Sequence, residues 1–185
     1  ALYDQLLASR KRAYPILMAL GYKLRMVGEI VQARELSEEA YRTAKQDKDR
    51  YEAAALRANL QKDTDDRIAW LAKGDPKDTH TQIELNGSRG EKALEDQNKE
   101  LAAQYLRKAI AGYESIAKTS AGLNNCGLAY LNLYRATSNP QDTQRGLALL
   151  EQAMTLEPGN SVLLINTLHV LLTHALGGVR SEERR

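Results

Sequence analysis

Helical spacing of apolar residues is the feature that most constrains the fold of this chain. Leu123, Cys126, Tyr130 and Leu133 recur at intervals of three and four residues, as on one face of an α-helix. The same spacing returns along most of the chain, and no segment alternates apolar and polar residues for long enough to predict a strand. The pattern therefore predicts an all-α protein. Its helices are expected over residues 2–12, 14–28, 30–46, 48–62, 65–73, 82–96, 98–118, 120–136, 142–156 and 160–176.

Residues 63–92 leave two interpretations open. The segment is polar and holds three glycines, Gly74, Gly87 and Gly90, which lower helix propensity. It fits either two helices or a loop with short helical turns. Trp70, the only tryptophan, fits either a core position or an interface anchor.

Composition and charge favour a water-soluble, cytoplasmic protein. Acidic and basic residues nearly balance, with 26 Lys and Arg against 24 Asp and Glu, and they are interleaved as on solvated helix faces. We therefore expect no nucleic-acid partner. The longest apolar stretch, residues 162–176, is short and interrupted by polar residues, so we expect no membrane partner. The single cysteine excludes an intramolecular disulfide, and the initial Ala1 suggests a piece of a longer chain.

The chain shows no arrangement of residues typical of an enzyme. His169 and His174 lie five positions apart, which does not place them on one helix face as metal ligands. Cys126 lies on an apolar face without a neighbouring base, and the acidic residues around Glu91 are interleaved with lysines. We expect no catalytic residue, no cofactor and no metal, and a closed helical-bundle enzyme is the least favoured alternative.

Glycines within apolar helices recur in a matched pattern. Gly21 and Gly90 are each followed twelve residues later by an alanine, and Gly127 is followed nineteen residues later by a glycine. A glycine inside a helix costs about 1 kcal/mol relative to alanine, so its recurrence favours close packing of two helices. The pattern predicts helical hairpins, the third with an insertion of seven residues. The small residues of the second helices are Ala33, Ala102 and Gly146.

One of these hairpins resembles a known repeat. The stretch Leu123-Asn124-Asn125-Cys126-Gly127-Leu128-Ala129-Tyr130, followed by Leu149 to Asn160, resembles a tetratricopeptide repeat, and residues 14–47 and 83–116 resemble it less closely. The resemblance implies stacked antiparallel helix hairpins that form a right-handed superhelix. The expected organisation is a single solenoid over residues 1–178 and a disordered tail over 179–185. Within the solenoid we expect the second helix of a truncated repeat at 1–13, repeats at 14–47, 83–119 and 120–160, a degenerate repeat at 48–82, and a terminal helix at 161–178.

The resemblance also implies a function, namely a scaffold or adaptor for protein–protein interaction. In this family the first helices of the repeats line a concave face that binds a peptide or a partner's helix. Methionine and tyrosine supply adaptable apolar contacts, and asparagine can bond a peptide backbone. Two alternatives stay open: adjoining repeats bury several of these side chains, or the chain is a regulatory or sensor domain that controls an attached effector domain. The candidate partner-binding residues are Met18, Tyr22, Arg25, Met26, Asn124, Asn125, Leu128, Asn132, Asn166 and His169.

Some members of the family grip the C-terminal carboxylate of a chaperone with Lys, Arg and Asn side chains on successive first helices. Asn125 corresponds to one Asn of that clamp. A buried carboxylate without a cation is costly, so we expect no such clamp here. The positions where neighbouring first helices would supply the other clamp residues, its cations among them, hold different residues. Before Asn125 these are Met18 and Tyr22 or Gly87 and Glu91, and after it they are Val162 and Asn166.

Overall fold

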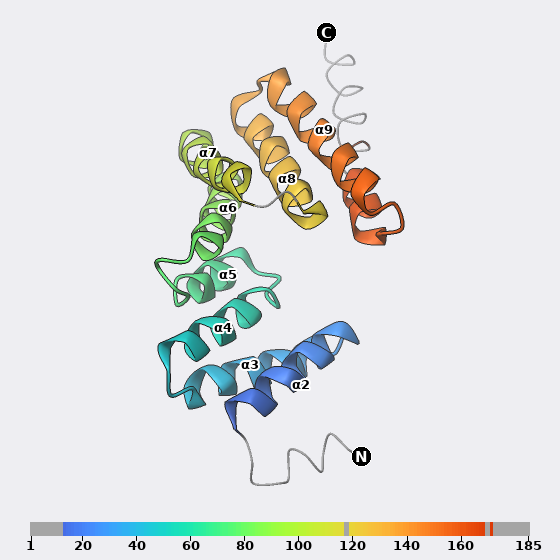
Figure 1. The fold of residues 1–185 in the computed structure, drawn as a ribbon. Helices are drawn as coiled ribbons and strands as arrows, with labels where there is room; N and C mark the ends of the chain where they lie inside the picture. The colour runs from blue at the N-terminus through green and yellow to red at the C-terminus, as the bar shows by residue number, and fades with distance from the viewer. Residues whose placement is uncertain (1–12, 117–118, 169–170, 172–185) are drawn as a thin grey trace. The chain divides into compact units, whose positions relative to one another are not determined.

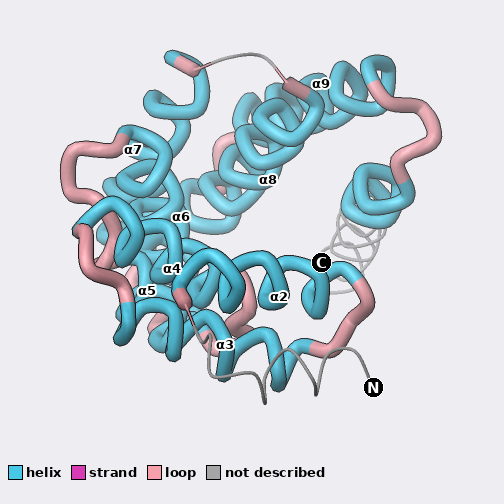
Figure 2. Tube along the Cα trace, turned by 60° about the horizontal axis from the view of Figure 1, so that its bottom comes forward, coloured by secondary structure: helices cyan, strands magenta, loops and turns pink. Residues whose placement is uncertain are grey.

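The computed structural model describes residues 13–116, 119–168 and 171, and this part of the chain is helical with short connections and no strand (Figures 1 and 2). The all-α prediction is confirmed. None of the described helices is long and apolar enough to cross a bilayer. Residues 161–168 are helical, and eight earlier helices have defined bounds: α2 (Tyr14–Met26), α3 (Ile30–Thr43), α4 (Asp47–Ala58), α5 (Thr64–Leu71), α6 (Thr79–Glu95), α7 (Lys99–Ser115), α8 (Ser120–Thr137) and α9 (Pro140–Leu156).

The expected helices agree with these bounds to within a few residues. The expected helix 2–12, most of the second half of the expected helix 160–176, and the expected tail 179–185 lie outside the described residues. The loop interpretation of residues 63–92 is wrong, because α5 and most of α6 occupy them. Local capping explains why. The carboxylate of Asp63 accepts a hydrogen bond from the N–H of Asp66 at 2.9 Å, and that of Asp78 accepts one from the N–H of Thr81 at 2.6 Å. Such caps satisfy N–H groups that the first turn leaves unpaired, and tertiary packing then outweighs the low propensity of glycine.

The chain forms two compact units, Ala1–Ser88 and Arg89–Arg185, and the boundary falls within α6. In the first unit, one apolar cluster joins α2, α3 and α4 around Leu17 and Leu56, and a smaller one joins Ala58, Leu71 and Leu85. In the second unit, a single cluster draws on the last turns of α6, on α7, α8 and α9, and on Leu163.

Two hairpins of the chain have the same register. Helix α2 ends five residues after Gly21, three residues form the turn, and α3 begins three residues before Ala33. Helices α6 and α7 keep these intervals around Gly90 and Ala102. Ala33 and Ala102 are both completely buried, which agrees with the expectation that small residues stand where paired helices meet.

The turns of these hairpins also match in backbone conformation. Each has a positive φ seven residues after the aligned glycine, 84° at Gly28 and 59° at Gln97. The following residue then donates its N–H back to the first helix, from Glu29 to Leu24 O at 2.9 Å and, in the other hairpin, from Asn98 to Ala93 O at 2.8 Å. This is the left-handed closure common at helix C-termini. The glycine of the first hairpin suits it better than the glutamine of the second.

The seven-residue insertion in the third hairpin lengthens both helices. Helix α8 continues ten residues past Gly127, and α9 begins six residues before Gly146. The two-residue turn contains Ser138, whose φ is also positive at 58°. Relative to the other hairpins, α8 gains five residues, α9 gains three, and the turn loses one. Because seven residues are close to two turns of about 3.6 residues, the buried faces stay aligned.

The aligned glycines stand where helices approach closely, as the sequence predicts. A Cβ atom at Gly21 would lie 3.2 Å from the Leu56 side chain, and one at Gly90 would lie 2.6 Å from that of Leu106. At Gly127 the nearest atom is the carbonyl oxygen of Gly146, at 2.9 Å. No larger residue fits any of these positions without a shift in its neighbours.

Candidate partner-binding faces

In the first unit, the first helices of successive hairpins, α2 and α4, lie side by side. The Tyr14 hydroxyl on α2 donates a hydrogen bond to the Glu52 carboxylate on α4 at 2.8 Å. Burial, with the Glu52 charge second, raises the pKa of Tyr22 on the same side of α2. The Tyr22 hydroxyl therefore stays protonated at neutral pH and remains a hydrogen-bond donor.

The four candidate residues on α2 differ in exposure. Met18 is only 4% exposed and belongs to the core, so its side chain is covered by this unit's own helices. Tyr22, Arg25 and Met26 are exposed, with Met26 at 76%. Sequence reasoning missed two further exposed apolar residues, Val27 and Val31, in and after the turn to α3. Val27 stands in the turn and Val31 near the start of α3, so neither lies on the first helix α2.

In the second unit, a chain of asparagine side chains links α8 to the helix at residues 161–168. Asn166 donates its amide N–H to Asn124 Oδ1 at 3.1 Å, and Asn124 donates in turn to Asn125 Oδ1 at 3.1 Å. Asn124 is only 6% exposed, and these two hydrogen bonds satisfy its buried side-chain amide. Asn125 is half-buried, and its amide nitrogen has no acceptor among the described residues.

About two turns further along α8, Asn132 bonds both within its helix and across to α6. Its amide nitrogen lies 3.5 Å from Glu91 Oε1, and its oxygen accepts a hydrogen bond from Arg135 at 3.1 Å. Leu128 lies half-buried between the asparagines along the helix. His169 lies outside the described residues. The structure thus brings Asn124, Asn125 and Asn166 together and gives Asn124 a packing role.

Trp70 packs in the first unit as a half-buried residue. Its ring meets that of Tyr41 edge-to-face with centroids 5.4 Å apart, and the Lys73 ammonium lies 3.7 Å from its centroid. The Arg57 guanidinium lies 5.3 Å from the same centroid. Aromatic faces attract such cations, so the cluster ties α3, α4 and α5 together.

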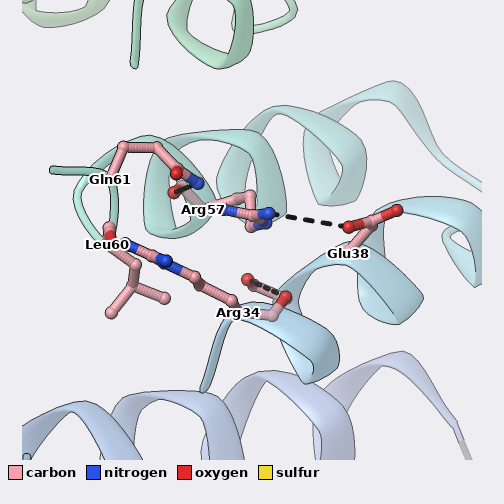
Figure 3. Close-up of polar contacts among 6 residues, drawn as sticks. Arg34, Glu38, Arg57, Leu60 and Gln61 are labelled. Atoms are coloured by element: carbon pink, nitrogen blue, oxygen red, sulfur yellow. Dashed lines mark hydrogen bonds and ion pairs between the residues drawn. The ribbon is translucent and has the colours of Figure 1, made fainter. Parts of the chain in front are cut away.

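Two arginines stabilise the same junction (Figure 3). Arg34 on α3 donates hydrogen bonds from Nε and Nη2 to the carbonyl of Leu60 at 2.8 and 2.6 Å, just beyond the end of α4. Arg57 on α4 points toward Glu38 on α3, at 3.7 Å. Its Nε and Nη1 are buried and find no hydrogen-bond acceptor in the described part of the chain, and burial lowers its pKa. Contact with Trp70 offsets this burial, and both arginines serve the packing of helices.

Cys126 is buried in the core of the second unit, where burial raises the pKa of its thiol to about 11. The thiol is therefore protonated at neutral pH and a poor nucleophile. Within residues 13–116 and 119–168, His, Cys, Asp and Glu side chains form no group of three that could hold a metal.

The fold defines an all-α protein built from helical hairpins. No family model matches the sequence of this chain, and no curated protein matches it significantly.

Proposed function

We propose that this chain is a tetratricopeptide-like solenoid that acts as a scaffold or adaptor and binds a peptide or a partner's helix along its first helices. Support for the repeat architecture comes from the hairpins. Two share helix register, a positive φ and closing hydrogen bonds, and the third differs by about one added turn in each helix. Recurrence of one supersecondary unit is the mark of a solenoid.

Support for the binding face comes from side chains on α2 and α8. On α2, Tyr22 and Met26 offer exposed apolar surface beside the Arg25 guanidinium. On α8, the Asn125 amide donor stands beside half-buried Leu128. Asn125 is the main support for this proposal. Its side-chain oxygen accepts a hydrogen bond from Asn124, so its N–H groups are held in place for a backbone carbonyl of a bound peptide.

Selection of binders from a random peptide library displayed on phage tests this function, with affinities measured by calorimetry. Peptides that bind the second unit should lose about tenfold or more in affinity to Asn125→Ala, and peptides that bind the first unit should lose as much to Tyr22→Ala, because each variant removes a direct contact. Gln104→Ala serves as the control, since Gln104 is exposed on the second helix α7. Peptides that bind both first-helix variants as tightly as the unaltered chain would place the binding site elsewhere, and a library without binders would refute the scaffold function.

A further inference from the structure

The second unit contains a pocket of about 340 Å³ between α7, the start of α8, and α9. Its α8 residues are Gly122, Leu123 and Cys126. None of them belongs to the candidate partner-binding residues, so the pocket is a separate site from the proposed peptide face. Its volume lies at the lower end of the range for small-molecule sites, about 300–1,000 Å³, and fits a compact ligand.

The floor of the pocket is apolar. Leu123, Cys126 and Leu149 are less than a tenth exposed and belong to the core cluster, and Tyr113 adds an aromatic ring that packs on it. Gly122 contributes no side chain to the wall. These groups suit an aliphatic or aromatic side chain, which would leave water on entering.

The mouth of the pocket carries one positive and one negative group. Arg145 Nη2 lies 3.9 Å from Glu114 Oε1, a loose ion pair whose side chains are 57% and 44% exposed. The same oxygen of Glu114 accepts a hydrogen bond from the Tyr130 hydroxyl at 2.9 Å, which fixes the carboxylate. More than half of the Arg145 side chain is exposed, and Gln152 adds a polar amide to the lining. The two groups have opposite charge and are only loosely paired, so a ligand with one negative and one positive group can pair with both.

We propose that this pocket binds the zwitterion of an α-amino acid with an apolar side chain. The ligand's carboxylate pairs with the Arg145 guanidinium, which can hold it with two parallel hydrogen bonds. The ligand's ammonium pairs with the Glu114 carboxylate, and its side chain lies on Leu123, Cys126 and Leu149. Each charge of the pocket then has a partner, and the apolar floor is covered.

Calorimetric titration with leucine and phenylalanine tests the proposal, with the N-acetyl and carboxamide derivatives of each as matched ligands. The free amino acids should bind about tenfold or more tightly than either derivative, because each derivative loses one charge-assisted contact. Arg145→Gln and Glu114→Gln should weaken binding similarly, and the latter keeps an acceptor for Tyr130. Arg107→Gln removes an exposed cation of α7 away from the pocket lining and should leave binding unchanged. Circular dichroism confirms that each variant is folded.

The reactivity of Cys126, the only cysteine, reports whether the ligand occupies the pocket. Bound leucine should slow alkylation of this thiol by iodoacetamide at alkaline pH, and Gln152→Trp, which narrows the mouth, should abolish both binding and protection. Equal affinity for the free acid and its carboxamide would overturn the proposal. So would the lack of binding by either amino acid at millimolar concentration, or binding that leaves Cys126 unprotected.

Discussion

Gly127→Ala tests the close approach of α8 and α9 with the smallest possible change. The added methyl group would stand 2.9 Å from the carbonyl oxygen of Gly146 and 3.0 Å from Leu150 Cγ. The leucine side chain can shift, but the oxygen belongs to the backbone of α9, so relief requires the two helices to separate. Gly87, within α6, provides the matched control, because a methyl group added there would meet no atom of the described residues within 4 Å.

Both substitutions share one favourable term, since alanine is preferred over glycine in a helix by about 0.5–1 kcal/mol. Gly87→Ala should therefore raise the free energy of unfolding by about that amount. Gly127→Ala adds an overpacking cost of about 1–3 kcal/mol. The helix-propensity term cancels between the two variants. The difference between their unfolding free energies therefore measures the cost of crowding α8 against α9.

Urea unfolding followed by circular dichroism measures this difference through the midpoint and slope of the transition. On heating, each kcal/mol corresponds to about 2–4 °C in Tm for a chain of this size. A Gly127→Ala variant that is as stable as Gly87→Ala would refute the reasoning, because the methyl group would then have found space between α8 and α9.

Three further predictions follow from packing, charge and the candidate face. Ala153→Leu should cost about 1–3 kcal/mol of unfolding free energy because Ala153 is completely buried, whereas Ala72→Leu at an exposed position should cost less; thermal unfolding measures both. Hydrogen bonds from Thr81 lower the pKa of Asp78, so they stabilise the fold above a pH of about 4 and this stabilisation is lost as the pH falls through the lowered value. The Tm difference between the unaltered chain and Asp78→Asn should therefore shrink as the pH falls below about 4, and a constant difference would contradict the assignment. A chaperone-tail peptide with a free carboxylate should bind no better than its amidated form in calorimetry, and a clear preference for the acid would reveal a clamp made of other residues.

The helices could be predicted from the sequence because their signals are local. Apolar spacing predicted α8 almost to the residue, and the matched glycines Gly21, Gly90 and Gly127 indicated where helices meet. The helices in residues 63–92 were harder to predict, because their apolar faces are short. Aspartate caps at Asp63 and Asp78 were the available signal there.

The exposure of individual site residues could not be predicted, because it depends on contacts between helices. Met18 and Met26 have the same chemistry and lie eight positions apart on α2, yet their exposures are 4% and 76%. Asn124 and Asn125 are adjacent, but only Asn124 is buried, since it faces Asn166. Helical spacing places a residue on a face, while the neighbouring element decides whether that face is covered.

The insertion in the third hairpin bears on the proposed function, because it enlarges the first helix. On α2, the last residue is Met26, five positions past the aligned glycine; on α8, Asn132 occupies that position and the helix continues to Thr137. Arg135 therefore stands on a turn that the first hairpin lacks, where its bond to Asn132 leaves the guanidinium exposed. A partner lying along α8 would meet this additional cation. Because the seven inserted residues preserve the buried faces, the longer surface is gained without disturbing the contact between Gly127 and Gly146.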